Sequence, residues 1–322
     1  MDAPSITLEM IHAAAQRLRG VALRTPLVAC PVEDAGLWVK AENLQPIGSF
    51  KLRGAYNKIS QLSPAELRRG VITYSSGNHA QGVAFAARAL GARTVIVMPS
   101  NAPAIKRAAT LALGAEIVEV GVASSDRLHK AEELVAKYGY AMIPPYDDEQ
   151  IITGQATCGL EIIEEISDVD IVFAPVSGGG LLSGVATAIK LLNPHTLVIG
   201  VEPELAADAA ESFASGNLTK WPAAKTSRTI ADGLRTQSLG KRNFALIQKY
   251  VAGIVTVSEA EIRASLRRLV STTRLIPEPS GAVAAAAVFF HRDKLPAFRK
   301  AVAIVSGGNL DPAQLQSILA GK

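Results

Sequence analysis

The chain has 322 residues, 48% of them hydrophobic and 19% charged, and its formal net charge is +4. This length fills one large or two modest domains with sizeable cores. Lysine and arginine are scattered among acidic residues, and no basic run is interleaved with aromatic residues, so nucleic acid is not predicted as a partner.

The first residues are predicted to form a helix rather than a signal sequence, because apolar residues recur at helical spacing through residues 6–18. No apolar run approaches the ~18 residues that a membrane span requires. The two cysteines, Cys30 and Cys158, fit no metal or disulfide spacing. We therefore expect a soluble, cytoplasmic protein with reduced cysteines and no membrane partner.

Short β-branched strands alternate with alanine-rich helices along most of the chain. The predicted strands cover residues 37–40, 71–74, 94–98, 116–120, 171–174, 197–199, 254–257 and 302–305. The predicted helices cover residues 6–18, 80–90, 104–113, 126–138, 150–166, 181–192, 259–272 and 281–290. This alternation is typical of parallel sheets covered on both faces. We predict an α/β fold with two doubly wound parallel-sheet domains, a large one of residues 1–60 plus 149–322 and a small one of residues 61–148.

One lysine follows a glycine-serine turn directly before a helix begins. Residues 48–54 read GSFKLRG, with Lys51 next to Phe50. In apolar surroundings this amine would lose its proton below its ordinary pKa of about 10.4. A neutral amine attacks aldehydes, which is the start of Schiff-base chemistry. Taken alone, the motif is more often an ordinary lysine on a helix surface.

Two glycine-rich loops follow predicted strands, where ligands bind in open α/β sheets. Residues 177–181 read SGGGL and open a helix, so backbone N–H groups and the helix N-terminus can converge on an anion. We predict a phosphate monoester site there, the alternative being a tight turn. Residues 306–309 read SGGN, and the hydroxyl of Ser306 can hydrogen-bond a ring nitrogen.

A third loop, residues 75–79, reads SSGNH and also leads from a strand into a helix. Asn78 offers its amide to a phenolate-type oxygen, and Ser76 offers a hydroxyl. Ser75 is alternatively a helix N-cap. His79 is expected to be a packed side chain rather than a catalytic one.

A lysine, a phosphate site, a neutral ring-nitrogen partner and an asparagine together describe a receptor for pyridoxal phosphate. The segments GSFKLRGAYNKI, SSGNHAQGVA, PVSGGGLLSG, TIADG, EPSGAVAAAA and IVSGGN occur in that order. In this the chain resembles fold-type II pyridoxal-phosphate enzymes, which are tryptophan synthase β-like, and specifically the serine/threonine dehydratase and serine racemase family. The resemblance covers nearly the whole length.

The resemblance implies a role for each loop. Lys51 would bind the cofactor as a Schiff base and move the substrate's α-proton, with Phe50 near the ring. The other implied cofactor contacts are Asn78 to the ring 3-oxygen, Ser306 to the ring nitrogen, and Gly178, Gly179, Gly180 and Leu181 to the phosphate. The substrate carboxylate would be held by the loop of Ser75, Ser76, Gly77, Asn78 and His79. A neutral serine at the ring nitrogen favours prompt β-elimination.

Three further positions bear on the reaction and the substrate. Ser76 stands where serine racemases and hydroxyaspartate dehydratases have serine and threonine dehydratases commonly have alanine, and its hydroxyl could return a proton from the face opposite Lys51. Tyr146 stands near the expected substrate side chain. Arg127 could pair with a second substrate carboxylate, the alternative being an arginine on a helix surface.

By the same resemblance, residues 202–208 match a divalent-cation loop. The carboxylates of Glu202 and Asp208 and the carbonyl of Ala206 form an oxygen site suited to Mg²⁺, Mn²⁺ or Ca²⁺. The alternative is a pair of solvated acidic residues after a strand.

The resemblance implies a lyase that eliminates water and ammonia from L-serine, L-threonine or a related 3-hydroxy amino acid. Within enzymes, the alternative is a serine or aspartate-type racemase with dehydratase side activity, or a 3-hydroxyaspartate dehydratase. A non-catalytic pyridoxal-phosphate-binding protein is a third possibility, against which the lysine, asparagine and serine argue. The family also implies a homodimer or homotetramer.

Overall fold

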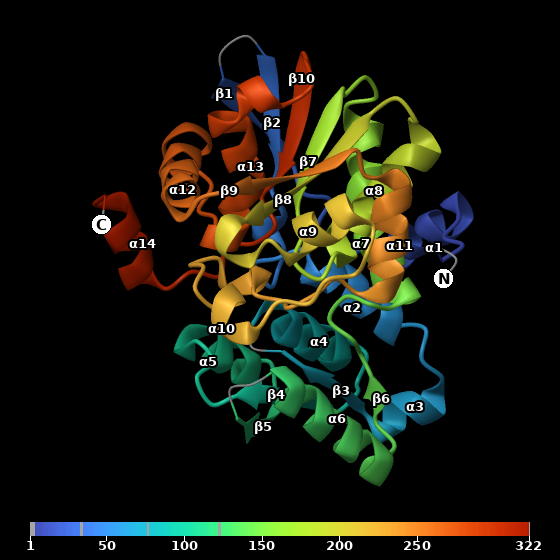
Figure 1. The fold of residues 1–322 in the computed structure, drawn as a ribbon. Coiled ribbons are helices and arrows are strands. Elements are labelled where there is room, and N and C mark those ends of the chain that lie inside the picture. The colour runs from blue at the N-terminus through green and yellow to red at the C-terminus, as the bar shows by residue number, and fades with distance from the viewer. Residues whose placement is uncertain (1–3, 33–34, 76, 122–123, 322) are drawn as a thin grey trace.

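A computed structural model describes residues 4–32, 35–75, 77–121 and 124–321, which form two sheets with covering helices (Figure 1). The larger sheet contains, in spatial order, β1 (Leu27–Val32), β2 (Ala35–Lys40), β10 (Lys300–Ile304), β7 (Ile171–Pro175), β8 (Leu197–Pro203) and β9 (Gly253–Val257). The smaller sheet contains β5 (Glu116–Val120), β4 (Thr94–Pro99), β3 (Val71–Tyr74) and β6 (Ala141–Met142). The predicted α/β class is confirmed.

Fourteen α-helices connect and cover the strands in the part of the chain that the structure describes. They are α1 (Leu8–Leu18), α2 (Lys51–Ile59), α3 (Pro64–Arg69), α4 (Asn78–Ala89), α5 (Ala104–Ala112), α6 (Ser124–Tyr138), α7 (Glu149–Glu165), α8 (Gly180–Leu192), α9 (Asp208–Ser215), α10 (Ala223–Thr226), α11 (Lys241–Tyr250), α12 (Glu259–Thr273), α13 (Pro279–Phe290) and α14 (Pro312–Leu319). Short 3-10 turns include η2 (Glu204–Ala206) and η3 (Asp232–Leu234).

The larger sheet is packed on both faces. Alternate residues of β7 point to opposite sides, so that Phe173 packs with α12 and α13 while Val172 packs with α8. Helix α13 is alanine-rich, and its residues from Pro279 to Val288 are all buried. A helix that is apolar on every side belongs in a core. The larger sheet is therefore a central layer between two layers of helices.

The sheets are not purely parallel, which corrects one expectation. Strand β1 runs antiparallel to β2, at the edge of the larger sheet, whereas the other pairings between these strands are parallel. Strand β1 was not predicted from the sequence, because Pro31 lies within it. Proline lacks the N–H that a central strand must donate, but it is tolerated in an edge strand.

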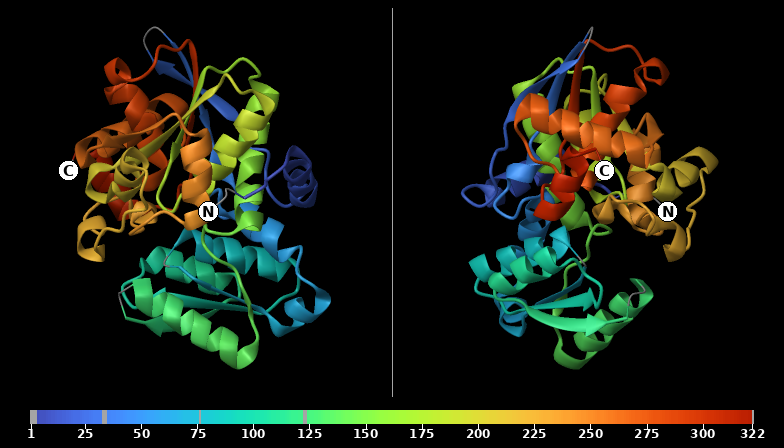
Figure 2. Two further views of the ribbon diagram at one scale, coloured as in Figure 1. Left: turned by 45° about the vertical axis from the view of Figure 1, so that its right-hand side comes forward. Right: turned by 90° about the vertical axis from the view of Figure 1, so that its left-hand side faces the viewer.

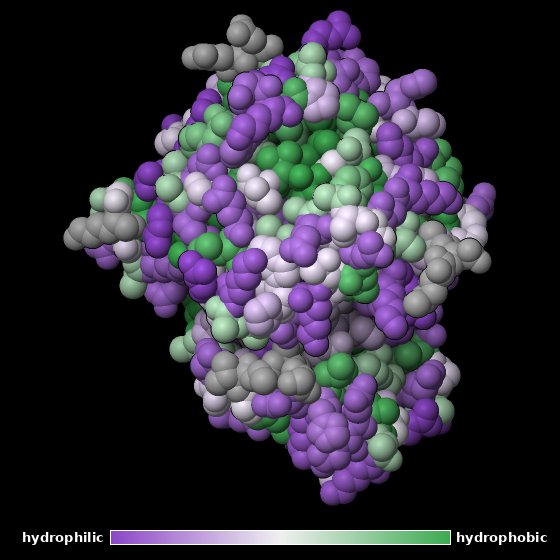
Figure 3. All heavy atoms as spheres, in the orientation of Figure 1, coloured by the Kyte–Doolittle hydropathy of each residue, from purple (hydrophilic) through white to green (hydrophobic). Residues whose placement is uncertain are grey.

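The smaller sheet and its helices α4, α5 and α6 form a small lobe below the larger sheet, which with α7 to α14 forms a large lobe (Figures 1 and 2). Helices α2 and α4 pack on one face of the smaller sheet and α6 on the other. The domain boundaries predicted at residues 60/61 and 148/149 stay a prediction. Hydrophilic side chains cover most of the molecular face shown in Figure 3.

Helix α2 lies between the lobes and crosses α7 at very short range. A methyl group at Gly154 would lie 2.6 Å from the Cα atom of Gly54, and one at Gly54 would lie 2.8 Å from the carbonyl oxygen of Ile151. Larger residues at either position would force the helices apart. Among the described residues, no helix is both long and apolar enough to cross a membrane.

Candidate active site

Lys51 is the first residue of α2, at the junction of the lobes. Its Nζ donates to the carbonyl oxygen of Pro145 at 2.7 Å and lies 5.2 Å from the centre of the Phe50 ring. Burial lowers the pKa of Lys51 to about 8. The lysine therefore has a much larger neutral fraction at physiological pH than a surface lysine has.

The turn before Lys51 is tied to the loop after β10 by backbone bonds. Phe50 N donates to the carbonyl oxygen of Ser306 at 3.1 Å, and Gly308 N donates to that of Gly48 at 2.9 Å. The Ser306 hydroxyl is buried and lies 3.5 Å from the carbonyl oxygen of Ser280. Two of the loops predicted to contact one cofactor are thus adjacent.

Residues 177–181 form the turn from β7 into α8. Two positions of this turn, 178 and 179, require glycine. Gly179 has a φ of +92°, a region that favours glycine. A methyl group at Gly178 would lie 2.4 Å from the ring of Tyr146. Ser177 is also left-handed, with φ +57°, and its hydroxyl lies 3.0 Å from that of Thr236. The first-turn N–H groups of α8, which include those of Gly180 and Leu181, have no partner within the helix and can hold an anion.

The loop of residues 75–79 enters α4 beside Lys51. A methyl group at Gly82 on α4 would lie 3.1 Å from the Lys51 carbonyl oxygen. The N-cap of α4 is Gly77, and the Ser75 hydroxyl accepts from Gly77 N at 3.2 Å, so Ser75 is not the helix cap. Ser76 lies outside the described residues.

Asn78 and His79 are both held by neighbours. Asn78 Nδ2 donates to Glu278 Oε1 at 2.5 Å, and Asn78 Oδ1 accepts from Asn309 Nδ2 at 2.9 Å. His79 is packed, as expected, with Nε2 3.0 Å from the carbonyl oxygen of Ile143. Burial, and then the positive charge of Lys51, lower the pKa of His79 to about 3. The imidazole is therefore neutral.

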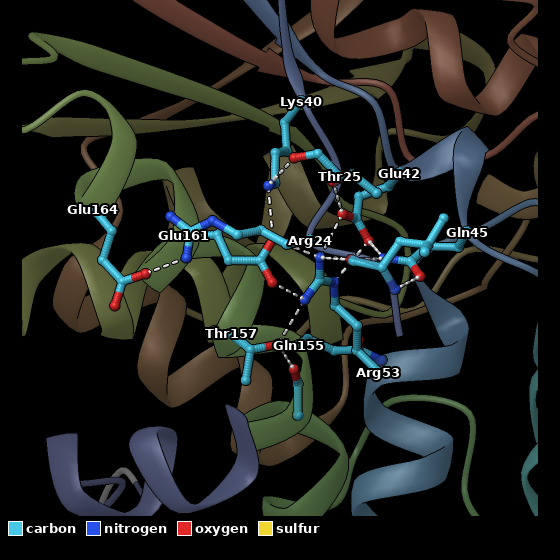
Figure 4. A network of polar contacts seen from close by, with 12 residues as sticks. Arg24, Thr25, Lys40, Glu42, Gln45, Arg53, Gln155, Thr157, Glu161 and Glu164 are labelled. Carbon is cyan, nitrogen blue, oxygen red and sulfur yellow. Dashed lines mark hydrogen bonds and ion pairs between the residues drawn. The ribbon is translucent and has the colours of Figure 1, made fainter. Parts of the chain in front are cut away.

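A buried polar network fixes α2 on the large lobe (Figure 4). Arg53, 1% exposed, contacts Glu42 through Nε at 2.8 Å and Glu161 through Nη1 at 2.7 Å. Lys40 also pairs with Glu161, at 2.7 Å. Sequence reasoning missed this network, although Arg53 lies within the lysine motif, because its acidic partners come from distant segments. It holds in place the helix that carries Lys51.

Tyr146 lies against the glycine loop, and Arg127 is close enough for its charge to act on the Tyr146 hydroxyl. The Tyr146 ring packs against Gly178, and burial raises the pKa of its hydroxyl. Arg127 is half-buried, burial lowers its pKa, and its positive charge acts on both Tyr146 and Tyr74. Its Nε is buried without a hydrogen-bond partner in the described parts of the chain. Arg127 is thus partly exposed on α6, and its pairing with a second substrate carboxylate stays a prediction.

Glu202 and Asp208 face each other in the interior. Each is 1% exposed. Glu202 Oε2 accepts from Ala210 N at 2.9 Å, whereas Glu202 Oε1 and both oxygens of Asp208 have no hydrogen-bond partner within the described ranges. Burial raises the pKa of Glu202 and brings that of Asp208 to about 7. The alternative of two solvated acids is wrong, because β8 extends to Pro203 and buries Glu202. No group of three or more histidine, cysteine or acidic residues that could hold a metal occurs in the described chain.

Comparison with known proteins identifies the family. The family model of pyridoxal-phosphate dependent enzymes matches residues 18–307. The L-threo-3-hydroxyaspartate ammonia-lyase of Saccharomyces cerevisiae is 39% identical, over 96% of this chain and 95% of the yeast protein. The catabolic L-threonine dehydratase TdcB of Escherichia coli (strain K12) is 41% identical, over 97% of this chain and 96% of its own length. The structure of maize serine racemase matches with a TM-score of 0.93 and 33% identity, over 99% of this chain and 98% of the maize chain.

Proposed function

Because the chain belongs to the pyridoxal-phosphate dependent enzyme family, we propose that it eliminates water and ammonia from L-serine, L-threonine or a closely related 3-hydroxy amino acid. The single observation that carries the proposal is the partly buried Lys51 amine, whose pKa burial lowers to about 8. Its surroundings support the assignment. The turn before Lys51 is bonded to residues 306–308, and the Lys51 charge acts on His79. The Pro145 carbonyl that accepts from Lys51 precedes Tyr146, which packs against Gly178.

The residues present fit the cofactor. Gly178, Gly179, Gly180 and Leu181 would hold its phosphate, Asn78 its ring 3-oxygen and Ser306 its ring nitrogen. The buried, neutral hydroxyl of Ser306 brings no positive charge to that nitrogen. When bound, the cofactor supplies an aldehyde for the amine of Lys51 and a conjugated ring that withdraws electrons from the substrate's α-carbon.

The chain's own groups then position the substrate and move its protons. Backbone N–H groups of residues 75–79 would hold the substrate carboxylate. The neutral amine of Lys51 would accept the α-proton, while the electrons of the C–H bond form a double bond to the β-carbon. The β-hydroxyl leaves with a proton as water. The released enamine hydrolyses to a 2-oxo acid and ammonia.

The test is an assay of L-serine, D-serine, L-threonine and both 3-hydroxyaspartate diastereomers, scored separately for oxo-acid formation and stereoinversion. Lys51→Ala should abolish oxo-acid formation and covalent attachment of the cofactor. The control is Lys130→Met, which removes a surface ion pair with Glu133 on α6 and should retain both. Full activity of Lys51→Ala, or purified protein that fails to bind the cofactor, would refute the proposal.

A second candidate, favoured by Arg127, is a 3-hydroxyaspartate dehydratase. The half-buried guanidinium with an unpaired Nε beside Tyr146 suits a second substrate carboxylate. A lost charged hydrogen bond costs roughly 1.5–3 kcal/mol, or about 10-fold or more in rate. Arg127→Met should therefore reduce kcat/KM for 3-hydroxyaspartate by at least that factor and leave serine unaffected. Equal losses for both substrates would exclude this role.

Racemisation is a third activity that this site could support. A serine at position 76 could return a proton on the face opposite Lys51. Ser76→Ala should then retain elimination while abolishing any inversion of serine. Unchanged inversion in this variant would show that another group delivers the proton.

We also propose that a divalent cation occupies the site of Glu202, Asp208 and the Ala206 carbonyl. Two buried carboxylates with three unpaired oxygens are costly without a cation. Oxygen ligands suit Mg²⁺, Mn²⁺ or Ca²⁺. A cation here would stabilise the fold rather than take part in the reaction.

The family resemblance supports a cytoplasmic homodimer or homotetramer. Leu23, Leu44 and Ile276 are each 44–50% exposed, and apolar residues of this size are often covered at interfaces. Light scattering coupled to gel filtration measures the assembly directly. A monomer at micromolar concentration would contradict this expectation.

A further inference from the structure

The motifs TIADG and EPSG have no proposed role in the reaction, although Glu278 and Ser280 of the second motif contact Asn78 and Ser306. They supply Asp232 and Glu278, which lie in the large lobe at η3 and directly before α13. Both carboxylates meet one side chain from the small lobe. Lys106 of α5 pairs with Asp232 Oδ2 at 2.7 Å and with Glu278 Oε2 at 2.9 Å.

Lys106 is an unusual residue for its helix. Its side chain is 3% exposed, although α5 lies at the surface and exposes Ile105 and Leu111. Burial lowers the pKa of Lys106, but the charges of Glu278 and Asp232 outweigh this and raise it, so the ammonium is retained. Removing one partner of such a buried pair leaves an uncompensated charge. Replacing Lys106 with an uncharged residue would therefore leave two acidic side chains of the large lobe without a cation at this contact.

The pair is adjacent to the substrate loop. A methyl group at Gly77 would lie 3.2 Å from the Cδ atom of Lys106, so the lysine stem runs along that loop. A methyl group at Gly307, next to Ser306, would lie 2.4 Å from Glu278 Oε1 and 3.1 Å from Asn78 Nδ2. Glu278 thus lies between the lysine and the residues proposed to hold the cofactor ring.

Glu278 also fixes the orientation of the Asn78 amide. Its Oε1 accepts one N–H of Asn78, and Asn309 donates to the amide oxygen. An asparagine amide has two N–H groups, so the second is left to donate to the cofactor's ring oxygen. Asn78 belongs to the small lobe and both of its partners to the large lobe. The amide can hold this orientation only while the lobes are closed.

We infer that Lys106, through Asp232 and Glu278, is a positioning residue that holds the small lobe closed and thereby sets Gly77 and the Asn78 amide for the reaction. The kinetic part of this inference rests on the proposed function, whereas the structural part does not.

The experiment compares Lys106→Met and Asp232→Asn with the control Lys130→Met in the full-length protein. Hydrogen exchange of the peptide that contains Asn78 is measured with and without pyridoxal phosphate. Opening of the lobes in Lys106→Met should accelerate exchange there at least ~10-fold in both states, with Lys130→Met unchanged. This readout does not depend on catalysis, so it stands even if the proposed reaction fails.

Kinetics provide the second readout. Small misplacements of substrate-positioning groups cost up to about 100-fold in rate. Lys106→Met should lower kcat/KM for the best substrate about 10- to 100-fold, with a raised KM and retained covalent binding of the cofactor. The Asp232→Asn variant should show the same changes more weakly, because the Asp232 side chain is 26% exposed. If Lys106→Met does not fold, the exchange and kinetics of Asp232→Asn test the inference. If the folded variants show the same hydrogen exchange and the same kinetics as the wild-type protein, the inference is overturned. A lower melting temperature alone would not support it.

Discussion

Removal of divalent cations should make the stability of this protein depend strongly on pH. Burial raises the pKa of Asp208 from its ordinary 3.8 to about 7, and that of Glu202 shifts in the same direction. Between these values the folded state binds more protons than the unfolded state, so stability falls as pH rises. At about 1.4 kcal/mol per pH unit, the Asp208 carboxyl alone corresponds to about 4 kcal/mol.

The assay is thermal unfolding of chelator-treated protein at pH 5 and pH 8, with and without Mg²⁺. Only the part of this shift between pH 5 and about pH 7 falls within the assay, which is about 3 kcal/mol for Asp208 alone. One kcal/mol corresponds to about 2–4 °C for a chain of this class, so the cation-free protein should melt about 6–12 °C lower at pH 8. Mg²⁺ should restore most of this loss at pH 8 and change little at pH 5, where the carboxyl groups are protonated.

The matched control is the double variant Glu202→Gln, Asp208→Asn, because other groups also titrate over this range. It should lack both the response to Mg²⁺ and the part of the pH dependence that these two carboxyls cause. If the wild-type protein and the double variant melt in parallel across pH with no response to Mg²⁺, Mn²⁺ or Ca²⁺, the reasoning about this site is refuted.

Three further outcomes follow from the same structure. The rate at which cofactor-free protein captures pyridoxal phosphate should rise with pH to a midpoint near 8, because the neutral Lys51 amine is the nucleophile; a midpoint near 10 would contradict its burial. Arg53→Met should cost about 3–5 kcal/mol in urea unfolding, since it strands the buried Glu42, whereas the surface variant Arg93→Met should cost under ~1 kcal/mol; equal costs would argue against the network. Gly154→Ala should lower the free energy of unfolding by about 1–3 kcal/mol, because the added methyl group pushes α2 away from α7. An unfolding midpoint equal to that of the wild-type protein would show that the two helices are less tightly packed there.

Most of the fold follows from local sequence patterns. The β-branched strands and alanine-rich helices were predicted because their periodicity is strong and their burial is two-sided. The exceptions are short or polar segments. Strand β6 has two residues and β1 contains Pro31. The helices that were not predicted, α3, α9, α10, α11 and α14, have only 4 to 10 residues. Their positions depend on tertiary packing, which a local pattern does not carry.

The candidate site divides in the same way. Lys51, Asn78, the glycine loop and Ser306 stand in motifs, so the sequence alone could assign them. Lys106 could not be found in this manner, because it lies on a surface helix among exposed apolar residues and its partners are distant along the chain. The Lys106 ammonium is buried by contacts between the two lobes, and these contacts cannot be predicted from the local sequence.

The backbone bonds between the Lys51 turn and the Ser306 loop carry a practical consequence for engineering. Main-chain hydrogen bonds persist through most side-chain replacements, so the relative position of Lys51 and Ser306 should tolerate changes made in the small lobe. A library that randomises positions 127 and 146 should therefore yield variants with altered substrate preference that still bind the vitamin B6 cofactor.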